Sequence, residues 1–155
     1  MGEVEMSVSI KASPAEIWQL IGDPTRMGEW SPECQKVQWM GGTTQPALNA
    51  RFKGHNRYGW RRWSTHGTIV RYEPEREIFW DVDLPFLPIA HWEYRIVPDP
   101  DGESCTVIET FRDRRNRVLD VLGPFVRGVK DVDAHNRAGM EETLARIKEA
   151  AESGR

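Results

Sequence analysis

Two polar side chains on a predicted β-hairpin, Tyr94 and Glu109, combine a hydrogen-bond donor with an acid or base. Their segments are joined by an Asp101-Gly102 turn, and a two-residue loop of this type determines which residues of the two strands are opposed. The opposed pairs on one face are then Trp92–Phe111, Tyr94–Glu109 and Ile96–Val107. Glu109 is therefore predicted to point its carboxyl group into an otherwise apolar surface.

A carboxylate in such a place has three interpretations. Burial raises its pKa and makes it a general acid or base, while Tyr94 donates a hydrogen bond to it or to a ligand carbonyl. An aldol-type cyclisation needs this pair of functions. Alternatively Glu109 contacts a ligand without catalysis, or it is structural and pairs with an arginine such as Arg62, because an unpaired buried carboxylate is costly.

Aromatic residues share the predicted concave face with this pair. They suit a planar or extended apolar ligand, although the alternative is that they fill the core. Asn136, the polar position in a C-terminal helical stripe, is predicted to bind the polar end of a ligand or a strand backbone group. The residues predicted to contact a ligand are Trp63, Thr65, Trp80, Trp92, Tyr94, Glu109, Phe111, Asn136 and Met140, with Glu109 and Tyr94 also the candidate catalytic pair.

Other kinds of chemistry lack sequence support. The four histidines have no zinc-ligand spacing, and Cys34 and Cys105 are isolated residues that we expect to be reduced. The sequence has no GxGxxG motif, P-loop, GxSxG or HExxH. We therefore expect no metal and no cofactor.

Two arginine clusters, residues 57–62 and 112–117, raise the question of nucleic-acid binding. Trp60 and Trp63 interleave with the first cluster as stacking platforms would. Against this, Asp113 and Asp120 interrupt the second cluster and the net charge is −3. We expect no nucleic-acid partner.

An uncharged apolar segment, Leu84-Pro85-Phe86-Leu87-Pro88, lies between two predicted strands. The interpretation we favour is that it gates a cavity. The alternatives are that it touches a membrane or packs in a homodimer.

Length and composition are those of one globular domain over residues 1–155. The chain has 39% hydrophobic residues and no apolar run long enough for a membrane span, so we expect a cytoplasmic protein without stable membrane insertion. Seven tryptophans exceed both phenylalanine and tyrosine in number, which requires either an aromatic core or a pocket lined by aromatic residues.

The elements that must position these residues follow from hydrophobic periodicity. Alternation over residues 3–10 predicts a strand, and Ser13-Pro14-Ala15-Glu16 predicts a capped helix that Gly22 ends. Asp23-Pro24 starts a second short helix. Strands follow, with a bulge expected near Gly67 to reconcile conflicting parity. From about residue 122 to Gly154 an apolar stripe predicts one long helix that crosses the whole sheet.

This order of elements, together with specific residues, resembles the START-like (SRPBCC) superfamily, which includes polyketide cyclase/dehydrase and lipid-transport proteins and pollen-allergen relatives. The residues that carry the resemblance are Ala12-Ser13-Pro14-Ala15-Glu16-Ile17-Trp18, Asp23-Pro24, Trp30-Ser31-Pro32, Arg62-Trp63, Trp92, Tyr94 and Glu109. It implies an α+β helix-grip fold, a curved antiparallel sheet of about seven strands wrapped around a long C-terminal helix, with two short helices after strand one. It also implies a cavity between sheet and helix.

Fold alone does not name an activity. The function expected is binding of a small hydrophobic or aromatic ligand, such as a lipid or a polyketide, in this cavity. The alternatives are a polyketide cyclase or dehydratase that uses Glu109 and Tyr94, and an interaction or regulatory module that acts through residues 84–88 and exposed arginines.

Overall fold

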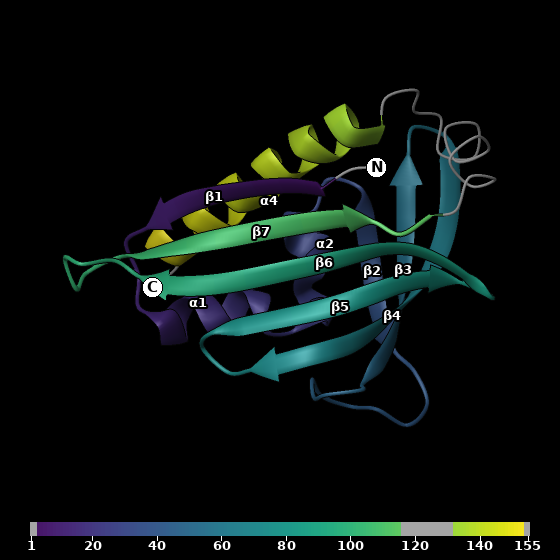
Figure 1. Cartoon of the computed structure of the whole chain (residues 1–155), viewed down its shortest axis with the longest axis horizontal. Coiled ribbons are helices and arrows are strands. Elements are labelled where there is room, and N and C mark those ends of the chain that lie inside the picture. Colours follow the sequence, from purple (N-terminus) through teal and green to yellow (C-terminus); the bar gives the residue numbers. More distant parts are fainter. Residues whose placement is uncertain (1–2, 116–131, 154–155) are drawn as a thin grey trace.

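The computed structural model describes residues 3–115 and 132–153, which form an open antiparallel sheet with helices on one of its faces (Figure 1). The seven strands lie in the order β1-β7-β6-β5-β4-β3-β2. The elements along the chain are β1 (Glu3–Ile10), α1 (Pro14–Ile21), the 3-10 helix η1 (Pro24–Arg26), α2 (Met27–Trp30), β2 (Cys34–Trp39), β3 (Arg51–Tyr58), β4 (Arg61–Glu73), β5 (Glu77–Leu84), β6 (Leu87–Pro98), β7 (Cys105–Asp113) and α4 (Val132–Ser153). The predicted α+β architecture is confirmed.

The short helices begin where their capping residues stand. The Ser13 hydroxyl accepts a hydrogen bond from the Glu16 N–H at 3.1 Å, and the Glu16 carboxylate accepts one from the Ser13 N–H at 2.9 Å. This reciprocal capping box satisfies two N–H groups that a helix leaves without internal partners. Asp23 accepts from the Thr25 N–H at 2.9 Å and starts η1 in the same way. These caps direct the chain from β1 across to β2, which is the opposite edge of the sheet.

The register of β6 against β7 is as predicted. Trp92 is opposite Phe111, and Tyr94 is opposite Glu109. The loop is longer than the expected two residues, because the Asp99 N–H donates to the Ser104 carbonyl at 2.9 Å and the Gly102 N–H to the Asp99 carbonyl at 3.1 Å. The turn thus comprises residues 100–103, with the same strand register as a two-residue loop.

The bulge in β4 lies at Val70 and not near Gly67, where the sequence placed it. The register shifts between Ile69 and Arg71, and the extra residue, Val70, is 40% exposed. Ile69 is buried before the bulge, and Tyr72 packs against the core after it. Gly67 has another role. A Cβ atom at this position would lie 2.3 Å from the Phe52 ring, so only glycine leaves space for that ring.

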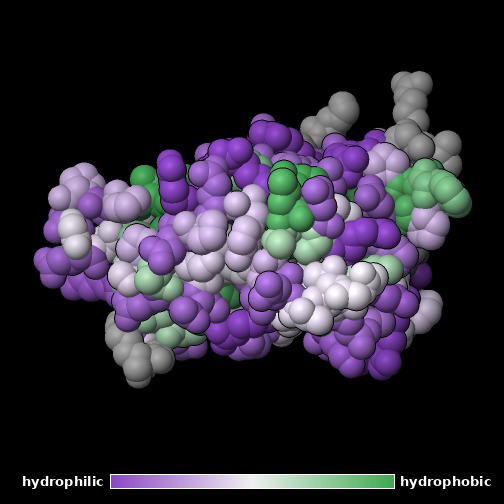
Figure 2. Space-filling model, turned by 90° about the horizontal axis from the view of Figure 1, so that it is seen from below, coloured by the Kyte–Doolittle hydropathy of each residue, from purple (hydrophilic) through white to green (hydrophobic). Residues whose placement is uncertain are grey.

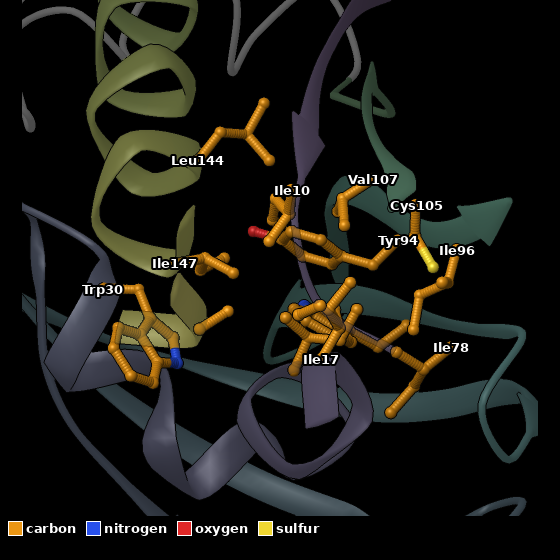
Figure 3. Packing of buried hydrophobic residues seen from close by; sticks show 14 of the residues in the cluster. Ile10, Ile17, Trp30, Ile78, Tyr94, Ile96, Cys105, Val107, Leu144 and Ile147 are labelled. Atoms are coloured by element: carbon orange, nitrogen blue, oxygen red, sulfur yellow. The ribbon is translucent and has the colours of Figure 1, made fainter. Parts of the chain in front are cut away.

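Helix α4 contributes the predicted buried stripe, which consists of Asn136, Met140, Leu144, Ile147 and Ala151. The expected residues 122–131 of the helix lie outside the described part of the chain, as does Gly154. Over its described residues the helix packs chiefly along β1, with contacts to α1, α2 and β7. Tyr94 extends from β6 toward this helix among the apolar core residues (Figure 3).

The surface is largely hydrophilic, and on the face that Figure 2 shows the hydrophobic residues form small, separate patches. Trp60, at the turn between β3 and β4, is 79% exposed, as its place among the arginines suggested. In the second arginine cluster the described members pair with acids: Arg112 with Glu3, Arg114 with Asp83 and Arg115 with Asp113.

Candidate functional site

A cavity of about 450 Å³ lies between the inner face of the sheet and α4. The structure brings together on its walls every residue predicted from the sequence to contact a ligand, which are Trp63, Thr65, Trp80, Trp92, Tyr94, Glu109, Phe111, Asn136 and Met140. Seven inward positions of the strands and two positions of the helix stripe thus line one space. Their role in binding remains a prediction.

The aromatic rings of the cavity pack against one another. Trp80 stacks on Tyr94 with ring centroids 5.5 Å apart, and Trp92 contacts Phe111 at 5.0 Å. Phe52 meets the edge of Trp80 at 6.0 Å. The aromatic residues thus contribute to the core and also line the cavity, so the two alternatives drawn from the sequence do not exclude each other.

Tyr94 and Glu109 form the polar centre of this apolar wall. The Tyr94 hydroxyl donates a hydrogen bond of 2.6 Å to Glu109 Oε2, and both residues are 2% exposed. Arg62, the sequence-based candidate for a structural ion pair, is exposed on β4. The pairing with Arg62 is wrong because alternation along β4 sends that side chain to the outer face.

Burial raises the pKa of Glu109 to about 8, and the hydrogen bond from Tyr94 opposes this only in part. Burial and the nearby Glu109 raise the pKa of Tyr94 well above its usual value. At neutral pH the carboxyl group is therefore mainly protonated, the form that carries a hydrogen to donate. Among the described residues, its second oxygen, Oε1, has no hydrogen-bond partner.

A second polar pair at the cavity, Asp113 with Arg115, was not singled out from the sequence. Arg115 lines the cavity, and its Nε donates to Asp113 Oδ1 at 2.8 Å. The side chains are 9% and 6% exposed. Continuing the alternation of Glu109 and Phe111 along β7 places Asp113 on the inner face, so this signal was present in the sequence.

Exposed lining residues mark the mouth of the cavity. Pro32, Tyr58 and Glu142 are exposed and belong to three separate elements or loops. His135 lies among them, with its Nε2 3.2 Å from Glu33 Oε1 and its ring centroid 4.6 Å from that of Tyr58. The exposed part of the lining thus includes charged side chains, whereas the rings of Trp80 and Phe111 are buried.

Cys34 also lines the cavity, and both cysteines are buried free thiols. Burial raises the pKa of Cys34 to about 11. The thiol therefore stays protonated at neutral pH and is a poor nucleophile. In the part of the chain that the structure describes, no group of histidine, cysteine and acidic side chains is arranged to hold a metal ion.

The apolar segment 84–88 is the tight connection of β5 and β6. Leu84 pairs with Leu87, and Phe86 is fully exposed at the turn. None of these five residues is among the described residues that line the cavity. The lining therefore gives no support to gating by this segment, although its neighbours Val82 and Ile89 do line the cavity.

Comparison with known proteins identifies one protein family. The model of a family described as polyketide cyclase / dehydrase and lipid transport matches residues 1–152. No curated protein matches the sequence. No helix among the described residues has the length and apolar character that a membrane crossing requires.

Solved structures share the fold. A protein of Deinococcus radiodurans superposes with a TM-score of 0.71 at 13% identity, covering 99% of this chain and 100% of that one. Major latex-like protein 151 of Panax ginseng gives 0.68 at 14%, covering 95% of each chain. A polyketide cyclase-like protein of Corynebacterium glutamicum gives 0.60 at 28% identity, covering 94% of this chain and 88% of that one. The expected helix-grip fold is confirmed.

Proposed function

This chain belongs to the polyketide cyclase / dehydrase and lipid transport family, and we propose that it binds a small hydrophobic or aromatic ligand, of the lipid or polyketide type, between the sheet and α4. The observation that carries the proposal is the aromatic wall around a cavity of about 450 Å³. Apolar ligand surface that leaves water contributes about 2.5 kcal/mol for each 100 Å². A dissociation constant of 1 μM corresponds to about 8.2 kcal/mol, which at this rate requires at least about 330 Å² of buried apolar ligand surface, so a body of two or more rings is expected.

Titration with N-phenyl-1-naphthylamine tests the proposal. This neutral apolar dye accepts energy from tryptophan, so its binding near Trp80 and Trp92 quenches protein fluorescence saturably. The matched control is Trp60→Phe, which removes an exposed tryptophan outside the cavity and is expected to leave the dissociation constant unchanged. Quenching that rises linearly without saturation contradicts the proposal.

A second candidate function is acid–base catalysis of the cyclase or dehydratase type, and the Tyr94–Glu109 contact favours it. With a pKa of about 8, Glu109 gives and takes protons near neutral pH. Substituting Glu109→Gln is expected to abolish turnover of a poly-β-ketone substrate while its affinity changes little. Unchanged turnover removes Glu109 from the mechanism.

The cytoplasmic location, the homodimer and the interaction module acting through residues 84–88 stay predictions from the sequence. Sedimentation at high protein concentration decides the assembly state. A monomer whose Phe86→Ser variant behaves identically removes the support for an interaction surface at the β5–β6 turn.

A further inference from the structure

Glu109 Oε1 is a buried polar atom at the cavity wall that none of the described residues satisfies with a hydrogen bond. Glu109 is 2% exposed, and Oε1 has no hydrogen-bond partner among the described residues. A buried polar atom left in this state costs about 1–3 kcal/mol. Its position at a cavity means that a bound molecule is able to remove this cost.

The neighbours of Glu109 do not neutralise it as an anion. Met6 on β1 and Tyr94 on β6 flank it in the sheet, and no described basic side chain forms an ion pair with it. The other titratable groups that line the cavity are Glu33, Cys34, Tyr58, Arg115, His135 and Glu142, of which Arg115 pairs with Asp113 and His135 with Glu33. The surroundings therefore favour an uncharged carboxyl group.

With Tyr94 as the donor to Oε2, the hydrogen of a protonated Glu109 carboxyl group is left to Oε1. Tyr94 has one hydroxyl hydrogen, and it donates that hydrogen to Oε2 at 2.6 Å. The protonated carboxyl group then has its own hydrogen on Oε1. That O–H is the donor for which the described protein residues provide no acceptor.

We propose that the ligand carries an uncharged oxygen acceptor, such as a ketone or ester carbonyl, on its apolar or aromatic body, and that Glu109 donates a hydrogen bond to this oxygen from Oε1. The inference rests on the proposed binding function and adds the chemical class of the ligand to it. A pure hydrocarbon fills the same space but leaves Oε1 unsatisfied.

A pair of ligands that differ by one acceptor tests the inference. We compare 2-acetylnaphthalene with 2-ethylnaphthalene, which has the same rings and nearly the same shape without the carbonyl oxygen. Dissociation constants are measured by tryptophan quenching at pH 6.0 and pH 9.5. For the wild-type protein the ketone is expected to bind about tenfold more tightly at pH 6.0, since one such hydrogen bond contributes about 1.4 kcal/mol. At pH 9.5 the preference is expected to fall below threefold, because the ionised carboxylate repels the carbonyl oxygen.

Two variants separate the donor from the ionisation. In Glu109→Gln the amide oxygen accepts from Tyr94 and the amide nitrogen donates to the ligand, so the preference for the ketone is expected at both pH values. In Glu109→Met the donor is absent, and the two naphthalenes are expected to bind equally at both pH values. Thermal melting of each variant shows that it is folded.

Each other outcome overturns one identifiable statement. Equal binding of both naphthalenes to the wild-type protein at pH 6.0 overturns the inference and leaves the binding function intact. Tighter binding of 2-(aminomethyl)naphthalene than of the ketone also overturns it, because Glu109 is then the anionic partner of a cationic ligand. If no naphthalene and no N-phenyl-1-naphthylamine binds saturably, the proposed function itself fails.

Discussion

The Tyr94 hydroxyl lies 2.6 Å from Glu109 Oε2, and this contact joins β6 to β7 inside the cavity. The two residues are cross-strand partners, so the sheet itself holds them together. A short phenol–carboxyl hydrogen bond in a water-poor place is stronger than the same bond at the surface. The polar centre of the site is therefore pre-formed before any ligand arrives.

The stability of the protein is expected to fall as Glu109 is forced to ionise. Its pKa is about 8 in the folded state and 4.5 as the ordinary value. Below pH 4.5 Glu109 is protonated in both the folded and the unfolded protein, so its ionisation does not change the free energy of unfolding. Above it the unfolded chain releases the proton first, so folding loses about 1.4 kcal/mol per pH unit until pH 8.

The variant Glu109→Gln cannot ionise and is expected to lack this loss. Urea denaturation of both proteins between pH 5 and pH 8 measures the difference in free energy of unfolding. The advantage of the variant is expected to grow with pH at about the slope above. A difference that stays constant with pH contradicts the assignment of the shifted pKa to Glu109.

Gly54 on β3 is expected to control the size of the cavity. It lines the cavity, and a Cβ atom there would meet Thr65 Oγ1 at 3.5 Å, an ordinary contact. The substitution Gly54→Val should therefore leave the fold stable and weaken N-phenyl-1-naphthylamine binding about tenfold by occupying ligand space. Unchanged affinity in a folded variant would place the dye outside this cavity.

Gly67 on β4 provides the contrasting case. A Cβ atom at Gly67 would lie 2.3 Å from the Phe52 ring, which packs between Trp39 and Trp80. The variant Gly67→Ala is expected to lower the free energy of unfolding by roughly 1–3 kcal/mol through overpacking. A melting temperature equal to that of the wild-type protein would show instead that the aromatic cluster rearranges at little cost.

Local signals in the sequence predicted the helix caps, the strand register around Tyr94 and the buried stripe of α4. They act over a few residues: Ser13 with Glu16 is a capping box, and alternation decides which side chains of β7 face inward. The β4 bulge was misplaced. Parity put Trp63 and Ile69 on one face and Val70 and Tyr72 on the other, which locates the switch after Ile69, but the bulge was assigned to Gly67 because glycine often marks bulges.

Properties that depend on several distant elements were also beyond local patterns. From the sequence, the partner of Glu109 was either an arginine such as Arg62 or Tyr94. The structure shows that it is Tyr94, because Arg62 is exposed on the outer face of the sheet. The mouth of the cavity depends on how β3, the loop before β2 and α4 meet, whereas the Asp113–Arg115 pair is local and its signal was present in the alternation of β7. The packing of α4 along β1 depends on the sheet's curvature, which no single segment encodes.

Phe86 is expected to be replaceable without effect on the ligand. It follows Pro85 with a φ of 63°, the left-handed conformation that glycine favours at this position of a type II turn. The variant Phe86→Gly should gain about 0.5–1 kcal/mol of stability and leave the association rate of N-phenyl-1-naphthylamine unchanged. A changed association rate would restore a gating role for the β5–β6 turn.

Cys34 is expected to resist thiol reagents in the native protein. Burial raises its pKa to about 11, so at pH 8 roughly one thiol in a thousand is ionised. Modification by 5,5′-dithiobis(2-nitrobenzoate), followed by absorbance, should be slow in buffer and fast in 6 M guanidinium. Rapid reaction in buffer would mean that the cavity admits the reagent and ionises the thiol.

The pairing of β1 with β7 sets the order in which the molecule is assembled. Glu3 pairs with Arg112, 109 residues later in the chain, so β1 has no sheet partner until nearly all other strands have been made. Contacts between such distant segments slow folding, because a long loop must close first. During synthesis the sheet therefore lacks its β1 edge until β7 has been made. The cavity is complete only once α4 has been synthesised, because residues of α4 form part of its wall.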